Sequence, residues 1–202
     1  MCIICISEKG VRQPDKALLR EMFLQNPDGA GFMWRGKDNK VHISKGYMTF
    51  SEFWRAVSAA EFTKADVVVY HFRISTQAGV QPSMTQPFPF TKDLVKTKAL
   101  DCIADLGIAH NGIIRAFSDP TDREYSDTAH FTAEFLAEVI HGPKDFSEKF
   151  LEELARHTNS RFAFLDKSGR VFTAGNFIKD LGGLLFSNLS YKRNRFTFQN
   201  VI

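Results

Sequence analysis

Three features that define large protein classes are scarce or missing in this sequence of 202 residues. Cysteine occurs only as Cys2, Cys5 and Cys102, an odd and sparse set that does not suit a disulfide scaffold and favours a reducing compartment. No apolar run approaches the ~20 residues of a membrane-spanning helix, and the first residues lack the pattern of a signal peptide. We therefore expect a cytoplasmic protein without a membrane segment.

A strong charge of one sign is also missing. The net charge is +3, too weak to indicate a nucleic-acid partner without a concentrated basic patch. One compact basic run exists, Tyr191-Lys192-Arg193-Asn194-Arg195. A run of this kind usually forms a solvated face, and contact with phosphate or nucleic acid is the alternative. Nucleic acid is therefore not an expected partner.

The composition indicates a folded globular chain. Hydrophobic residues make up 44% and charged residues 24%, and phenylalanine occurs 20 times, which predicts a well-filled core. No internal repeat, low-complexity tract or linker interrupts the sequence. We expect residues 1–202 to form a single domain.

Apolar periodicity and turn residues predict many short strands and a few helices. Helices are expected after Asp15, from the capping box at Thr49 to Glu52, from Ser126 towards His141, and after Ser147. Strands are expected in residues 2–6, 29–34, 41–44, 65–74, 106–109, 161–165, 171–174, 184–186 and 196–198. Residues 77–98 read as an irregular, proline-bearing loop. The hairpin order predicts an α+β fold of antiparallel sheets layered with helices.

Cys2 is the first candidate for chemistry, because removal of Met1 would place a thiol and a free α-amine on one carbon. The amine has an unperturbed pKa of about 7.7–8.0 and the thiol of about 8.5, so the pair can exchange a proton near neutral pH. The alternative is a small residue at the head of a buried strand. A metal or redox pair with Cys5 is disfavoured, because residues three apart on a strand face opposite sides.

Two charged residues stand at the ends of predicted elements. Arg73 ends an apolar strand, where it could hold a carboxylate through two hydrogen bonds or form a structural ion pair. Asp127 lies at a helix start, where it could cap the helix. Together they would suit the two charged ends of a free α-amino acid.

Asn111 and Gly112 follow a short apolar strand and have two possible roles. Asn-Gly is a common hairpin turn, but the amide and a glycine N–H could also stabilise a developing oxyanion. His71 and His110 could act as acid or base, although a hydrogen-bonded structural role is the better expectation.

Five motifs then occur in one particular order along most of the chain. They are Cys2, Asn26-Pro27-Asp28-Gly29-Ala30-Gly31, His71-Phe72-Arg73-Ile74-Ser75-Thr76, Ala109-His110-Asn111-Gly112-Ile113-Ile114, and Ser126-Asp127-Thr128. In combination they resemble the class II glutamine amidotransferase domain of the N-terminal nucleophile hydrolase superfamily. The compact length and the segment Ser187-Asn188-Leu189-Ser190-Tyr191 resemble stand-alone versions from bacteria and their phages.

The resemblance implies a four-layer αββα sandwich of two antiparallel sheets and an activity that needs no metal or cofactor. By this likeness Cys2 attacks the side-chain amide of L-glutamine, giving a γ-glutamyl thioester and ammonia, while its own α-amine carries the proton. The resemblance implies that Asn111 and Gly112 form the oxyanion hole. It further implies that Arg73 binds the substrate carboxylate, that Asp127 binds the α-ammonium, and that Thr76 lines the pocket. Ammonia would pass to a separate synthase or transferase.

The sequence departs from the family pattern at Ile3, where glycine often follows the nucleophile, and at Gln77 and Gln86, where histidines are common. The two glutamines predict hydrogen bonding at their positions rather than proton transfer. Two alternative functions remain open: an N-terminal-cysteine amidohydrolase acting on another amide, and a catalytically silent binding or regulatory module of the same fold.

Overall fold

The fold consists of short strands that pair in two sheets and helices on their outer faces. The structure, a computed structural model, describes residues 1–75, 79–119 and 121–195, of which the last three only by their backbone. The strands are β1 (Ile3–Ser7), β2 (Ala30–Arg35), β3 (Val41–Tyr47), β4 (Val68–Phe72), β5 (Phe88–Pro89), β6 (Asp101–Ala104), β7 (Leu106–Asn111), β8 (Arg161–Asp166), β9 (Val171–Ala174), β10 (Ile178–Lys179) and β11 (Leu185–Phe186). The helices are α1 (Lys16–Gln25), α2 (Phe50–Ala59), α3 (Asp127–His130), the π-helical η4 (Phe131–Leu136), α4 (Ala137–Val139) and α5 (Glu148–Thr158). Short 3₁₀ helices are η1 (Pro82–Met84), η2 (Leu94–Lys98), η3 (Arg115–Phe117), η5 (Pro143–Asp145) and η6 (Ser190–Arg195).

Both sheets are antiparallel. In the described residues the larger sheet has the order β10-β11-β1-β4-β2-β3-β6, and the smaller one the order β5-β7-β8-β9. β1 lies against β4 with Ile3 opposite Phe72, which brings the start of β1 beside the end of β4. In the smaller sheet, Asn111 at the end of β7 lies opposite Arg161 at the start of β8.

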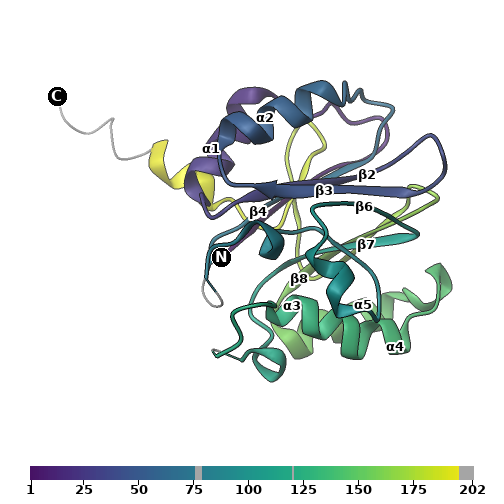
Figure 1. The fold of residues 1–202 in the computed structure, drawn as a ribbon. Helices are drawn as coiled ribbons and strands as arrows, with labels where there is room; N and C mark the ends of the chain where they lie inside the picture. Colours follow the sequence, from purple (N-terminus) through teal and green to yellow (C-terminus); the bar gives the residue numbers. More distant parts are fainter. Residues whose placement is uncertain (76–78, 120, 196–202) are drawn as a thin grey trace.

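Three apolar clusters hold the layers together, and alternation along the strands decides which side chains join each. On the outer face of the larger sheet, Ile3 and Cys5 pack under α1 and α2. Between the sheets, Ile4 and Ile6 meet Ala109 and other residues of the smaller sheet. On the far side, a cluster rich in phenylalanine packs the smaller sheet against the segment from α3 to α5 (Figure 1).

The predicted helix starts are confirmed by their caps. Asp15 accepts from Leu18 N at 2.9 Å and Ser147 from Phe150 N at 3.2 Å. Thr49 and Glu52 form the predicted capping box of α2. Each side chain satisfies a backbone N–H that the first helical turn leaves without a partner. These caps explain why the helix starts could be predicted from the sequence.

The α+β class and the two antiparallel sheets are as predicted, with differences in detail. β6 was not predicted, because its alternation of exposed and half-buried residues at a sheet edge is weak. The expected loop at residues 77–98 contains the two-residue strand β5, which pairs with β7. The helix expected from Ser126 towards His141 contains a π-helical stretch that periodicity does not signal. The strand expected at 196–198 lies outside the described residues.

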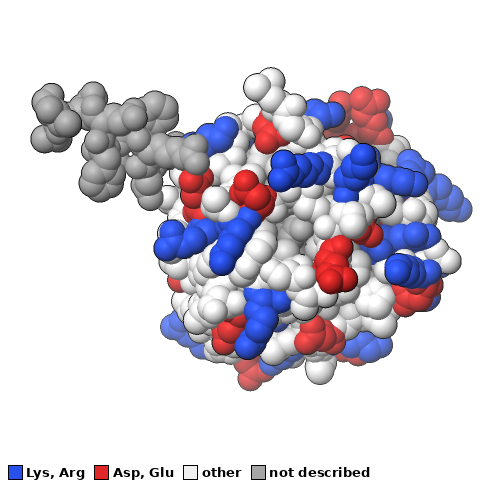
Figure 2. Space-filling view, turned by 90° about the horizontal axis from the view of Figure 1, so that it is seen from above, with Lys and Arg blue, Asp and Glu red and all other residues white. Residues whose placement is uncertain are grey.

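The outer face over α1 and α2 carries basic and acidic side chains side by side rather than one continuous basic surface (Figure 2). Lys192 of the basic run is exposed, with its Nζ 5.9 Å from the centre of the Tyr191 ring. No helix in the described part of the chain combines the length and the apolar character needed to cross a membrane.

Candidate active site

Four of the predicted site residues line one small cavity. Cys2, Arg73, Gly112 and Asp127 surround a space of about 70 Å³ that Met1 also borders. Asn111 is completely buried directly before Gly112. The remaining two positions of interest, Thr76 and Gln77, lie outside the described residues. The predicted residues lie directly before β1, directly after β4, at the end of β7 and at the start of α3, so they meet only through the fold.

Cys2 lies at the head of β1 and is fixed by two asparagines. Asn188 Nδ2 donates to the Cys2 carbonyl at 2.7 Å, and Asn26 Nδ2 donates to the Met1 carbonyl at 2.8 Å. The Cys2 Sγ lies 3.8 Å from the Ile74 carbonyl oxygen. Burial raises the pKa of the thiol, and the nearby Arg73 charge offsets this in part. A thiol with a raised pKa needs a base beside it to become the thiolate nucleophile. Cys5 packs in the core under α1 and α2, as strand alternation predicted.

Arg73 follows β4 and is held by the turn at Asp28 and Gly29. The Arg73 N–H donates to the Gly29 carbonyl at 2.8 Å, and the Asp28 N–H donates to the Arg73 carbonyl at 3.1 Å. Asp28 Oδ2 also accepts from Ser75 N at 2.7 Å. Gly29 has φ +109°, and a Cβ there would lie 2.5 Å from the Thr85 side chain, so glycine is needed. The turn therefore fixes the position of the Arg73 backbone directly after β4.

Arg73 is 6% exposed as a residue, and its Nη2 donates to the Gly79 carbonyl at 2.9 Å. Burial lowers its pKa, while the charges of Cys2, Asp28 and Asp127 act in the opposite direction. An arginine remains protonated across the physiological range. The guanidinium is thus a fixed positive charge at the cavity wall.

Asp127 does not cap its helix, which corrects one of the two roles expected for it. Ser126 is the N-cap of α3 and accepts from Ala129 N at 3.2 Å. Asp127 instead accepts from Ile114 N at 2.7 Å and from Thr128 N at 2.6 Å. Burial raises the pKa of its carboxyl, and these hydrogen bonds oppose that shift. Asp127 therefore ties α3 to the segment that follows Gly112.

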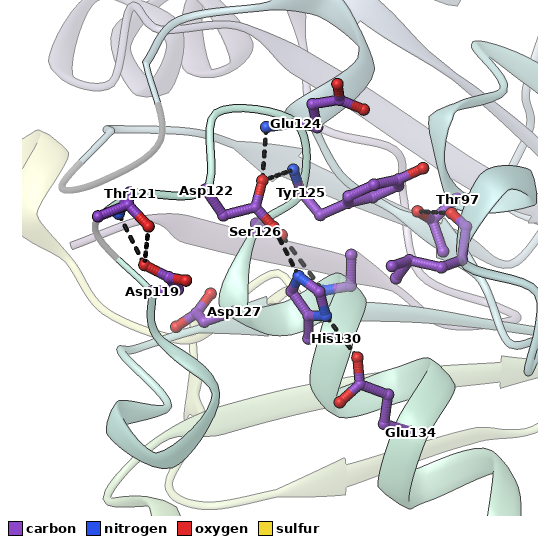
Figure 3. A network of polar contacts seen from close by, with 12 residues as sticks. Thr97, Asp119, Thr121, Asp122, Glu124, Tyr125, Ser126, Asp127, His130 and Glu134 are labelled. Carbon is purple, nitrogen blue, oxygen red and sulfur yellow. Dashed lines mark hydrogen bonds and ion pairs between the residues drawn. The ribbon is translucent and has the colours of Figure 1, made fainter.

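A polar network holds the loop before Asp127 (Figure 3). His130 Nε2 lies 2.8 Å from Asp122 Oδ2, and His130 Nδ1 lies 2.5 Å from Glu134 Oε1. Burial lowers the pKa of His130, but the two carboxylates outweigh burial and the net shift is upwards. His130 of α3 therefore connects the loop, through Asp122, with Glu134 of η4.

Asn111 and Gly112 do not form the hairpin turn that was one of their two expected roles. Asn111 is the last residue of β7, and the chain continues into η3 rather than into a paired strand. Asn111 Nδ2 donates to Ser187 Oγ at 3.0 Å, and its Oδ1 has no hydrogen-bond partner in the described part of the chain. A Cβ on Gly112 would lie 2.0 Å from Ser160 Oγ. Close packing therefore requires glycine after Asn111.

His71 and His110 are buried in a hydrogen-bond chain at the small cavity, which His110 also lines. His71 Nε2 donates to the His110 carbonyl at 3.0 Å, and His110 Nδ1 lies 2.8 Å from Thr128 Oγ1. Burial lowers the pKa of each imidazole to about 3. Gln86 accepts from His110 N at 2.7 Å and donates to Thr128 Oγ1 at 3.3 Å, which is the hydrogen-bonding behaviour expected of it. Both histidines are neutral at pH 7 and too weakly basic to activate the thiol.

Asn26, Ser187 and Asn188, which lie around Cys2 and Asn111, belong to segments that carry the family resemblance, but no role was predicted for them. Asparagine and serine are ordinary loop residues, so their individual roles follow only from their contacts across the fold. Among the described residues, no group of three or more His, Cys, Asp or Glu side chains could hold a metal ion. No protein-family model and no curated protein matches this chain.

Proposed function

We propose that this protein is a class II glutamine amidotransferase domain that hydrolyses the side-chain amide of L-glutamine through Cys2. The proposal rests mainly on one observation: Cys2, Arg73, Gly112 and Asp127 line the same small cavity. These residues are far apart in the sequence, and they supply a nucleophile, a cation, an oxyanion donor and an anion. The layering of helices on two antiparallel sheets suits the αββα sandwich of N-terminal nucleophile hydrolases.

The charged residues explain why the substrate is an α-amino acid. Arg73 offers a guanidinium to the α-carboxylate, and Asp127 offers a carboxylate to the α-ammonium. Both side chains are already fixed by backbone contacts, Arg73 through Gly79 and Asp127 through Ile114. Preorganised charges of opposite sign bind a zwitterion without further ordering cost. The substrate side chain then extends towards Cys2.

Activation of Cys2 rests on its own α-amine. The buried thiol has a raised pKa, and His71 and His110, with pKa values of about 3, are too weakly basic to serve. Removal of Met1 would create an amine with an unperturbed pKa of roughly 7.7–8.0 on the same residue. Asn26 holds the Met1 carbonyl at 2.8 Å, so its amide would lie beside the new amine. The amine takes the thiol proton and later gives it to the leaving ammonia.

The oxyanion hole combines the Gly112 N–H with the amide of Asn111. In the arrangement described above, Ser187 Oγ accepts both from Asn111 Nδ2 and from Ile4 N, the latter at 2.9 Å. A half-turn of the Asn111 amide exchanges its oxygen and nitrogen. The Ser187 O–H then donates to Oδ1, Ile4 keeps its bond, and both N–H groups of Nδ2 become available to the substrate oxygen. We infer that this second orientation is the catalytic one.

The test is glutamine hydrolysis by protein whose mass shows that Met1 has been removed. We expect release of glutamate and ammonia, and loss of activity in Cys2→Ala. Cys102→Ala is the matched control, because Cys102 is a partly exposed thiol on β6, outside the cavity. Activity that survives in Cys2→Ala, or a complete lack of activity in the processed protein, would refute the proposal. The second outcome would favour a silent binding module.

The ammonia acceptor belongs to a separate synthase or transferase in this proposal. Cys2→Ala protein would keep the substrate site and is therefore a suitable bait for co-purification. Recovery of an amide- or amine-forming enzyme that releases product only with glutamine and active Cys2 would support this. Free release of all ammonia in the presence of that enzyme would contradict it.

A further inference from the structure

A second and much larger cavity adjoins the small one. Its volume is about 1070 Å³, and Met1, Gly112 and Ile113 line both cavities. Most of its other wall is apolar or aromatic. The walls include Phe117, Phe131, Phe135, Phe150 and Leu154. A largely apolar cavity of this size with a few charged groups in its lining, here Arg115 and Glu153, is typical of a small-molecule site.

The π-helical segment η4 supplies two of the aromatic residues of this wall, Phe131 and Phe135, while Phe117 comes from η3 and Phe150 from α5. Phe131 and Phe135 stack with ring centres 5.3 Å apart, and Phe117 meets Phe131 edge-on at 5.1 Å. Phe135 nevertheless remains 44% exposed. π-Helical turns are rare and frequently occur at functional sites. The wider turn and the exposed ring are therefore a second indication that this surface binds a ligand.

The position of the cavity tells which half of a substrate would enter it. Arg73 and Asp127 line only the small cavity, whereas Gly112 lines both. A substrate held by its α-amino-acid end, with its carbonyl at Gly112, directs its leaving group across Ile113 into the large cavity. Ammonia is too small to need such a space.

We propose that the large cavity binds the amine half of an N-substituted γ-glutamyl amide, so that the preferred leaving group is an apolar, aromatic or branched amine. This rests on the proposed function, because it uses the same nucleophile and the same γ-glutamyl site. The Cys2 sulfur forms a bond to the γ-carbonyl carbon, and the C–N bond breaks. The amine leaves with the proton carried by the Cys2 α-amine. Water then hydrolyses the thioester to glutamate and restores the thiol.

The experiment compares L-glutamine with γ-L-glutamyl-benzylamide as substrates of the Met1-processed protein. We expect kcat/KM for the benzylamide to exceed that for glutamine by about ten-fold or more, the range that apolar contacts supply. Phe135→Ala should lower the ratio of the two kcat/KM values by about ten-fold. Val139→Ala is the control: Val139 is 45% exposed on the same helical stretch, outside the cavity lining, and should leave the ratio unchanged.

The outcomes separate the two proposals. Cleavage of glutamine with no advantage for the benzylamide, or an unchanged ratio in Phe135→Ala, would overturn the amine site and leave the glutaminase standing. Cleavage of neither substrate would refute the proposed function itself. A dimer in sedimentation that Phe135→Ala dissociates would assign the cavity to a second copy of the chain and would also overturn the amine site.

Discussion

Lowering the pH should destabilise this protein through two histidines. His71 and His110 are 0% and 2% exposed, and burial lowers the pKa of each to about 3. In the unfolded chain their pKa returns to about 6.5. Below pH 6.5 the unfolded state binds protons at these two histidines, whereas the folded state does not. The free energy of unfolding therefore falls as the pH falls from 6.5 towards 3.

The size of the effect follows from the two pKa values. At pH 5 each unfolded imidazole is about 97% protonated, which favours unfolding by about 2 kcal/mol per histidine. The pair therefore removes about 4 kcal/mol between pH 7 and pH 5, a large part of the stability of a typical domain. His130 has a raised pKa and acts in the opposite direction, so it offsets part of this loss.

The assay is urea unfolding at pH 7.0 and pH 5.0, and the quantity of interest is the difference in unfolding free energy between them. His71→Gln keeps a donor near Nε2, and His110→Asn keeps one near Nδ1. Each variant should be less stable than the wild type at pH 7, but should lose about 2 kcal/mol less on acidification. His141→Gln is the control, because that side chain is exposed and should leave the difference unchanged.

A wild-type loss below about 1 kcal/mol between the two pH values would refute the reasoning. An unchanged loss in both His71→Gln and His110→Asn would do so as well. Either result would mean that the folded protein accommodates imidazolium in this layer, and then the histidines could no longer be set aside as bases for Cys2.

Three further predictions concern residues around and away from the cavity. Burial lowers the pKa of Lys45 to about 7, so unfolding free energy should rise between pH 7 and pH 9, by about 2 kcal/mol, and Lys45→Met should flatten this rise in urea titrations. A wild-type free energy of unfolding that does not change between pH 7 and pH 9 would contradict this prediction. Ser187→Ala should lower kcat for glutamine about ten-fold and Asn111→Ala about 10²–10³-fold, both with little change in KM. A change in KM as large as the change in kcat would argue for a structural role instead. Thr49→Ala removes the capping box of α2 and should lower the free energy of unfolding by about 1 kcal/mol in the urea assay, while kcat stays unchanged. A loss of stability near zero would contradict this prediction.

The elements that the sequence predicted are those with a local physical signal. Capping side chains mark the starts of α1, α2 and α5, and two apolar runs joined by the turn at residues 166–170 mark the hairpin of β8 and β9. The elements it missed have no such signal. β6 gains its order from pairing with β3, and the π-helical turn of η4 depends on how the helix packs on the smaller sheet.

The same distinction applies to the candidate site. Cys2, Arg73 and Asp127 could be singled out because each has a nucleophilic or charged side chain at the end of a predicted strand or helix. The segment with Ser187 and Asn188 contributed to the family resemblance, but the roles of these two residues could not be predicted, because they depend on contacts with Asn111 and Cys2 across the fold. The left-handed Gly29 illustrates an intermediate case: a turn was predictable, but its role in fixing Arg73 was not.

One hydroxyl joins the two sheets at the point where the proposed chemistry occurs. Ser187 Oγ contacts Ile4 N on β1 and the amide of Asn111 at the end of β7. The pairing of Ile3 with Phe72 meanwhile brings Cys2 to the level of Arg73 within the larger sheet. Because strand register changes only in whole residues, and a slip of one would turn these side chains to the other face, the distance between nucleophile and cation is set by the sheet itself. The distance between nucleophile and oxyanion donor crosses the gap between the two sheets, so it depends on the contacts between them. The bond from His71 to the His110 carbonyl is one such contact, and the Ser187 hydroxyl is the one that reaches the Asn111 amide itself. We therefore expect loss of this serine to reduce kcat more than substrate binding.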